Sequence, residues 1–269
     1  AARSIGVDVD LPGPHPARHP EGARGVARPD ARDQAVVRAV RQRDGLVVVD
    51  TSTSEPATTA KTREALAALE RAAEPWVGMR TEVIGGQLLD MMLESLRSES
   101  VEMANRVNRY KTAAYTIERP LHLGAALAGA DEATIGAFRG YGRDVGIAFQ
   151  LRDDLLGVFG DPAITGKPAG DDLREGKRTE LFATAVGLLA ETDPDGAEEL
   201  RAGIGQTADG AKLRRLAQLI RDSGAEDAVE QRIEQLTASG LEYLEGAGIN
   251  DAAVDALTAL ARKATDRRK

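Results

Sequence analysis

A change of character near residue 60 constrains the fold of this chain more than any other feature of its sequence. Up to residue 58 the chain is crowded with proline, glycine and arginine, and its apolar residues do not recur at a helical period. Five prolines there would each interrupt a helix: Pro12, Pro14, Pro16, Pro20 and Pro29. We therefore expect residues 1–58 to form an atypical segment, either disordered or not the native reading of the gene.

Helical periodicity begins at Thr59 and continues to the end of the chain. Apolar residues recur there every three or four positions, which predicts one helical domain over residues 59–269. The first helix is expected to end at Pro75, and the others are expected at 77–96, 101–128, 131–159, 174–189, 210–223, 225–245 and 251–265. The predicted fold class is an all-α bundle.

Single residues mark some of the expected boundaries. Asp131, Asp209 and Asn250 stand where helix N-caps are expected, and Gly129 stands where a helix should stop. The apolar run Leu46–Val49 has the composition of a strand, but no partner strand is evident, so it receives little weight.

Composition excludes several classes of protein. The net charge of −8 argues against a general nucleic-acid binder. The absence of cysteine rules out disulfides, thiolate metal sites and cysteine nucleophiles. No apolar run reaches the roughly 18 residues that span a bilayer, and the first residues lack the apolar stretch of a secretory signal. We therefore expect a cytoplasmic protein without a transmembrane segment.

The most informative stretch lies on the helix predicted over residues 131–159. Gln150, Asp153, Asp154 and Gly157 are spaced i, i+3, i+4 and i+7, so they share one helix face. The rest of that segment is apolar, and two adjacent carboxylates there would repel each other unless a positive group lies between them. A cation that prefers oxygen ligands, above all Mg²⁺, would meet this requirement.

A glycine- and proline-rich loop over residues 160–172 follows this helix. The loop and the residues after it supply further charges at Lys167, Asp171, Asp172 and Lys177. Lysine ammonium groups can bind phosphate oxygens as point charges. The alternative is a capped helix end followed by a solvated, charged loop. The helix face and the loop by themselves leave both interpretations open.

Together, this helix face and loop resemble the second aspartate-rich region of trans-isoprenyl diphosphate synthases, the polyprenyl synthetase family. The family's usual form has a third aspartate where Gly157 stands, so Asp153 and Asp154 are the matching carboxylates. The resemblance implies that these two bind Mg²⁺ bridging an allylic diphosphate. It also implies that Lys167 and Lys177 contact that diphosphate.

Two upstream segments are similar to the same family. Lys111 and Thr112 match its helical Lys-Thr motif, in which the lysine meets the diphosphate and the threonine lies beside the reacting carbons. Gln87 and Asp90 match its Gly-Gln-x-x-Asp segment, and both are expected to point toward the substrate cavity. The agreement runs from residue 77 to residue 269 and is closest to actinobacterial geranylgeranyl diphosphate synthase-like proteins.

The resemblance implies an isoprenoid synthase-type helical bundle and a prenyltransferase activity that depends on Mg²⁺. Isopentenyl diphosphate would be condensed with an allylic diphosphate to give a longer all-trans isoprenyl diphosphate. The implied catalytic residues are Lys111, Thr112 and Gln150, and the implied substrate-binding residues are Gln87, Lys111, Gln150, Lys167 and Lys177. A homodimer is the implied assembly.

Part of the family pattern has no counterpart before residue 77. The family's first motif, Asp-Asp-x-x-Asp, and its Gly-Lys-Arg segment do not occur there, so we expect a bundle that lacks its N-terminal helices. A frameshift, a wrong start and a real extension are all compatible with residues 1–58. The residues that set product length precede the first motif in the family, so product length is not predicted.

Two other functions compete with the prenyltransferase. One is a truncated, catalytically impaired homologue that serves as a binding or regulatory subunit of a complete synthase. The other is a terpene cyclase, which shares the helical fold. The cyclase is disfavoured because Gln150 and the two aspartates have the form of the synthase motif.

Overall fold

The computed structural model describes residues 40–43, 46–49, 56–166 and 168–266. The chain divides into two compact units, residues 1–59 and residues 60–269. The elements in chain order are β1 (Val40–Arg43), β2 (Leu46–Val49), α1 (Pro56–Ser95), α2 (Val101–Val107), η1 (Asn108–Glu118), α3 (Arg119–Ala128), α4 (Glu132–Phe159), α5 (Pro162–Thr165), α6 (Asp171–Glu175), α7 (Glu180–Thr192), α8 (Pro194–Gly203), α9 (Gly210–Asp222), α10 (Ala225–Glu242) and α11 (Asp251–Thr265).

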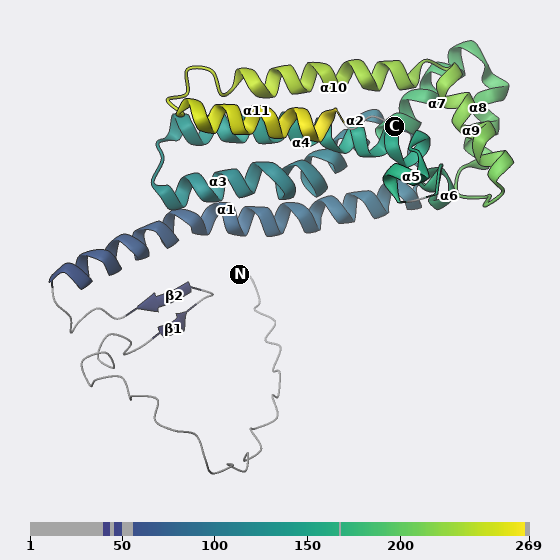
Figure 1. Ribbon diagram of the computed structural model, residues 1–269. Helices are drawn as coiled ribbons and strands as arrows, with labels where there is room; N and C mark the ends of the chain where they lie inside the picture. Colours follow the sequence, from purple (N-terminus) through teal and green to yellow (C-terminus); the bar gives the residue numbers. More distant parts are fainter. Residues whose placement is uncertain (1–39, 44–45, 50–55, 167, 267–269) are drawn as a thin grey trace, which may run out of the picture. The chain divides into compact units, whose positions relative to one another are not determined.

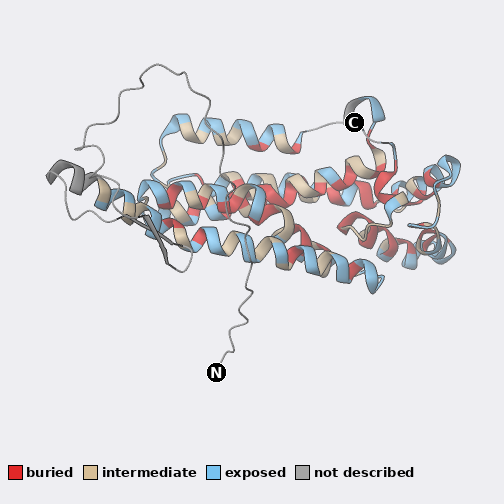
Figure 2. Cartoon of the chain, turned by 90° about the horizontal axis from the view of Figure 1, so that it is seen from below, coloured by how far each residue is buried: buried red, intermediate tan, exposed pale blue. Residues whose placement is uncertain are grey.

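Helix α4 forms the centre of the larger unit. It packs against η1, α3, α7, α10 and α11, and α1 runs along the side of the bundle nearest α3 (Figure 1). The largest buried cluster joins α4 to α7, α9 and α10 through leucine, alanine, valine and isoleucine side chains, with Phe182 among them. Buried residues gather on the inward faces of these helices, whereas the outward faces are exposed (Figure 2). Every described element between residues 60 and 266 is helical, which confirms the predicted class.

The prediction that Pro75 ends a helix was wrong. Helix α1 runs without interruption from Pro56 to Ser95 and contains Pro75, which is buried. Proline removes one hydrogen bond from a helix, but α1 is held by the bundle on both sides of this position. Arg71 Nε donates to the carbonyl oxygen of Ala126 at 2.8 Å, and Glu82 binds Arg119. Tertiary contacts on both sides of Pro75 therefore stabilise the helix despite the proline.

Two other predicted helices differ in detail from the structure. The segment 101–128 is continuously helical, but its middle portion, η1, is a π-helix of 11 residues. The helix expected over 174–189 is instead two helices, α6 and α7. The break begins at Gly176, which ends α6 with a φ of 82° in the left-handed region. Helix α8 was not predicted.

The smaller unit contains a β-hairpin that was not predicted. Strand β2 corresponds to the apolar run that lacked an evident partner, and it pairs antiparallel with β1 in the register Val40–Val49 to Arg43–Leu46. Polar residues in β1 concealed that strand, because only one of its four residues, Val40, is apolar.

The predicted N-caps are confirmed. The side chains of Asp131, Asp209 and Asn250 each accept hydrogen bonds from backbone N–H groups in the first turn of α4, α9 and α11. Gly129 ends α3 with a φ of 72°.

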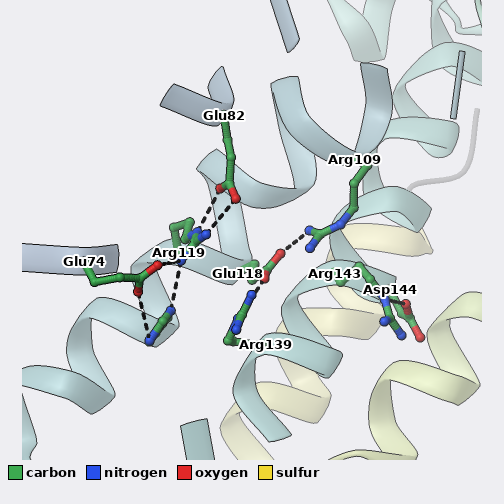
Figure 3. A network of polar contacts seen from close by, with 9 residues as sticks. Glu74, Glu82, Arg109, Glu118, Arg119, Arg139, Arg143 and Asp144 are labelled. Atoms are coloured by element: carbon green, nitrogen blue, oxygen red, sulfur yellow. Dashed lines mark hydrogen bonds and ion pairs between the residues drawn. The ribbon is translucent and has the colours of Figure 1, made fainter. Parts of the chain in front are cut away.

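An ionic network fixes the position of η1 and α3 in the bundle. Glu118, at the end of η1, is 1% exposed and lies between Arg109 and Arg139 (Figure 3). The next residue, Arg119, donates from Nε and Nη2 to the two carboxylate oxygens of Glu82 at 2.8 and 2.6 Å. The network therefore links η1 to α4 and α3 to α1. Among the described residues, no helix is sufficiently long and apolar to cross a membrane.

Candidate functional site

A pocket of about 250 Å³ lies where α1, α2, η1, α4 and the start of α7 meet. Polar and charged side chains from segments far apart in the chain converge on it. Its lining comprises Asp90, Ala104, Val107, Asn108, Lys111, Thr112, Gln150, Asp153, Asp154, Lys177, Arg178 and Thr179. This pocket contains most of the residues that the sequence singled out, and its mixed charges suit an anionic ligand together with a cation.

A chain of hydrogen bonds crosses the pocket from η1 to α4. The Thr112 hydroxyl donates to Oε1 of Gln150 at 2.7 Å, and Gln150 Nε2 donates to Oδ1 of Asp154 at 2.8 Å. The other carboxylate oxygen of Asp154, Oδ2, is buried and accepts no hydrogen bond. Because a buried carboxylate oxygen without a partner is unfavourable, Oδ2 is the natural position for a positive ligand.

The electrostatics of Asp154 support the same assignment. Burial raises the pKa of Asp154 well above its ordinary value, against the opposing hydrogen bond from Gln150. The charges of Asp172 and Asp153 raise that pKa further. Burial also raises the pKa of Asp172, against the opposing effect of Lys177. Asp154 is therefore a buried carboxylate that lies close to two other acidic side chains.

Both described lysines in the pocket are ion-paired with carboxylates. Lys111 Nζ donates to Asp90 of α1, and Lys177 Nζ donates to Asp172 of α6. Lys177 also lies 3.4 Å from Glu175. Burial would lower the pKa of Lys177, but the hydrogen bond and charge of Asp172, together with those of Glu175, outweigh that effect and raise the pKa. Both ammonium groups thus lie where an anion would enter.

The structure brings together six of the eight residues predicted for the site. Lys111, Thr112, Gln150, Asp153, Asp154 and Lys177 all line the pocket. Gln87 is exposed on α1 and is not among the lining residues, whereas Asp90, predicted to share its face, is. Lys167 lies outside the described residues.

Two buried residues near the pocket were not singled out from the sequence. Asn108, at the start of η1, is 6% exposed, and its Nδ2 has no hydrogen-bond partner. Glu180, at the start of α7, is 2% exposed and is bound by Asn105 at 3.2 Å and by Arg232 at 2.7 Å. No motif in the sequence marks either position. Both residues stand out only in the structure, where each is a buried polar side chain at the start of a helix.

A larger groove of about 670 Å³ lies between α4, α10 and α11. Much of its lining is leucine, isoleucine and alanine, and Arg152, which lines it, is bonded to both carboxylate oxygens of Glu230 at 2.6 Å. The Arg152 guanidinium is thus already paired with a carboxylate. We therefore place the candidate site in the smaller pocket, where a buried carboxylate oxygen lacks a partner.

The donor set of the smaller pocket fits a magnesium ion that shares its ligands with a phosphate. Asp153 is exposed, and the adjacent Asp154 offers its unpartnered oxygen. Among the described side chains, no three of His, Asp or Glu form a preformed cage for a metal. Mg²⁺ commonly takes one or two carboxylates and completes its octahedral shell with water and phosphate oxygens, so two carboxylates are sufficient.

Comparison with known proteins identifies the family. Residues 52–220 match the model of a family described as polyprenyl synthetase. The chain belongs to this family. A geranylfarnesyl diphosphate synthase of Aeropyrum pernix is 41% identical over 153 residues, which cover 56% of this chain and 45% of that protein. A geranylgeranyl diphosphate synthase of Mycobacterium tuberculosis is 35% identical over 158 residues, which cover 57% of this chain and 44% of that one.

A solved structure of the family has the same fold. The geranylgeranyl pyrophosphate synthase of Corynebacterium glutamicum, crystallised with isoprenyl diphosphate and magnesium, is 55% identical and superposes with a TM-score of 0.74. The match covers 79% of this chain and 59% of that chain. It confirms the predicted isoprenoid synthase-type bundle. The chain spans about half the length of the curated relatives that it matches.

Proposed function

We propose that this protein is a trans-prenyltransferase that condenses isopentenyl diphosphate with an allylic diphosphate to give a longer all-trans isoprenyl diphosphate. The observation that carries the proposal is the pocket between η1 and α4, where Lys111, Lys177 and the Asp153–Asp154 pair converge. The synthases that the chain resembles, and the magnesium and isoprenyl diphosphate in the related crystal structure, support this substrate class.

The residues of the pocket would act mainly on the leaving group. Lys111 and Lys177 would bind the oxygens of the allylic diphosphate and stabilise its negative charge as the C–O bond breaks. The alkene of isopentenyl diphosphate would then attack the allylic carbon, and a proton would leave the new product. Thr112 and Gln150, joined by a 2.7 Å hydrogen bond, would lie beside the reacting carbons and fix the orientation of Asp154.

The cofactor we propose is Mg²⁺, held by Asp153 and Asp154. When bound, the ion would supply additional positive charge at the departing diphosphate. The role of Asp154 is to present Oδ2, because Gln150 already occupies Oδ1. Lys167 would add a further contact to the diphosphate.

An alternative is a catalytically impaired homologue that pairs with a complete synthase. In the printed sequence, adjacent aspartates occur only at 153–154 and 171–172, so the first aspartate-rich motif has no counterpart. We propose incubating the purified chain with radiolabelled isopentenyl diphosphate, farnesyl diphosphate and Mg²⁺, alone and with a complete homologue. Product from the chain alone supports the enzyme. Product that changes only in the mixture supports the subunit.

The partner we propose for assembly is a second copy of this chain. Helix α1 carries exposed apolar residues Val77, Ile84, Leu88 and Met91 at spacings of seven, four and three, so they form one stripe. The stripe lies opposite the α1 face that contains the buried Ala72, Gly86 and Leu93. An apolar stripe of this kind suits packing against a like helix, and the family resemblance supports a homodimer.

A further inference from the structure

A side chain at position 157 and the Asp172 carboxylate would occupy the same space beside the aspartate pair. Gly157 lies one helical turn beyond Asp153 and Asp154 on α4, at the position where the usual family motif has its third aspartate. A Cβ built on Gly157 would lie 2.1 Å from Oδ2 of Asp172 and 2.4 Å from its Cγ. No real Cβ approaches other atoms so closely, because the atoms would overlap. The Asp172 carboxylate thus fills the volume that a side chain at position 157 would need.

Local contacts place Asp172 here. Asp172 is 6% exposed and lies in the short helix α6. Its side chain binds Lys177, and its backbone carbonyl oxygen accepts hydrogen bonds from the N–H groups of Gly176 and Lys177 at 3.1 and 3.0 Å. The loop therefore places the Asp172 carboxylate and the Lys177 ammonium together at the edge of the pocket.

A second feature shows that the acidic side chains Asp153, Asp154 and Asp172 leave a place for a positive ligand. Oδ2 of Asp154, which is 4% exposed, has no partner, and Asp172 is among the charges that act on Asp154. As the side chains stand, Asp172 is bonded to Lys177 and does not join Asp153 and Asp154 in a three-carboxylate cage.

We propose that Asp172, reaching in from α6, supplies the third carboxylate of this site in the space that Gly157 leaves open. Lys177 is its counter-ion until a cation and a diphosphate bind. Lys177 then turns to the diphosphate, and the Asp172 carboxylate turns to the hydrated cation. This inference rests on the proposed function. It makes Gly157 and Asp172 a coupled pair, because the carboxylate keeps its place only while position 157 lacks a side chain.

The test uses the full chain and inorganic diphosphate with Mg²⁺, measured by calorimetry, together with melting temperatures without added ligand. The variants are Asp172→Asn, Gly157→Ala, Asp172→Ala and the double variant Gly157→Ala/Asp172→Ala. Asp171→Asn is the matched control, since Asp171 is the neighbouring buried aspartate of α6 but binds Arg174. Gly136→Ala is the second control, because a Cβ there meets nothing within 4 Å on the same helix α4.

We expect Asp172→Asn to weaken binding of magnesium diphosphate by about tenfold or more, as loss of a group that orients a metal site does, and Asp171→Asn to leave it nearly unchanged. Gly157→Ala should lower the melting temperature and weaken binding, whereas Gly136→Ala should do neither. In the Asp172→Ala background, the added methyl at position 157 should no longer lower the melting temperature, although binding stays weak.

Two results would overturn the inference while leaving the proposed function intact. The first is normal binding by Asp172→Asn. The second is equal behaviour of Gly157→Ala and Gly136→Ala in both measurements. If the unmodified protein fails to bind magnesium diphosphate at all, the proposed function is wrong, and the inference about Asp172 is wrong with it.

Discussion

Gly146 of α4 lies so close to Ala113 of η1 that a Cβ added to the glycine would come within 2.6 Å of the alanine Cα. The same approach recurs one turn earlier, where a Cβ on Gly142 would lie 2.4 Å from the Cα of Glu118. The two helices therefore touch backbone to backbone. Ala113 directly follows Lys111 and Thr112, so this contact sets the depth at which both enter the pocket.

Gly146→Ala should destabilise the protein because the methyl group has no room. Overpacking of this kind typically costs about 1–3 kcal/mol, which calorimetric or denaturant unfolding would measure. Gly187→Ala is the control, since a Cβ on that α7 glycine meets nothing within 4 Å. Equal stability of the two variants would contradict the close packing of α4 on η1.

Asp153→Ala should abolish most of the proposed activity. Charge stabilisation at one such site is often worth about 3 kcal/mol, which corresponds to roughly a hundredfold loss of rate. Asp153 is exposed, so its loss should leave the fold intact. The radiolabelled condensation assay measures the effect, with Asp255→Ala, an exposed aspartate of α11, as the control. Full activity in Asp153→Ala would show that the aspartate pair has no role in the proposed reaction.

Stability should depend on pH through Glu118. Burial would raise the pKa of Glu118, but Arg109 and Arg139 outweigh it and hold the pKa below its ordinary value of 4.5. The folded state therefore favours the ionised form, and this contribution is present above pH 4.5 and is lost as pH falls through the lower folded pKa. The stability gap between the unmodified protein and Glu118→Gln should shrink below pH 4.5.

Unfolding of both proteins by denaturant between pH 3 and pH 7 (about the range in which a carboxyl group titrates) would measure this gap. A gap that stays constant on the acid side would show that the ion pairs with Arg109 and Arg139 do not carry the effect.

Ile84→Asp should prevent the proposed self-association. Ile84 is 70% exposed at the centre of the α1 stripe, and a charge there would be buried without a partner in any helix–helix contact. Light scattering after size-exclusion chromatography should show a dimer for the unmodified protein and a monomer for the variant. Leu260→Asp places the same charge on α11, at a residue 60% exposed, and should remain dimeric. Loss of the dimer in both variants would argue against the α1 stripe as the dimer interface.

The sequence was a good guide wherever local chemistry decides the structure. The N-caps at Asp131 and Asp209 and the stop at Gly129 depend on neighbouring backbone groups, and all three are found. The spacing of Gln150 and Asp154 predicted a shared face, and the two side chains are hydrogen-bonded to each other at 2.8 Å.

The sequence was a poor guide wherever contacts with distant residues determine the local structure. The helix passes through Pro75 because Arg71 and Glu82 on either side of it are both held by α3, which no local rule can show. Gln87 shares a helix with Asp90, yet only Asp90 meets Lys111, because the bundle selects one side of α1. The place of Asp172 beside Gly157 likewise depends on a loop that folds back over α4.

For the proposed reaction, the pairing of both pocket lysines bears on the order of events. A diphosphate that binds both ammonium groups would displace Asp90 from Lys111 and Asp172 from Lys177, so its capture would be an exchange of anions. Ligands with a single weak charge would compete poorly with the resident carboxylates, which favours multiply charged anions such as diphosphates. When diphosphate departs, the same carboxylates can reclaim their lysines and help to expel it. The pocket would thereby reset itself between turnovers.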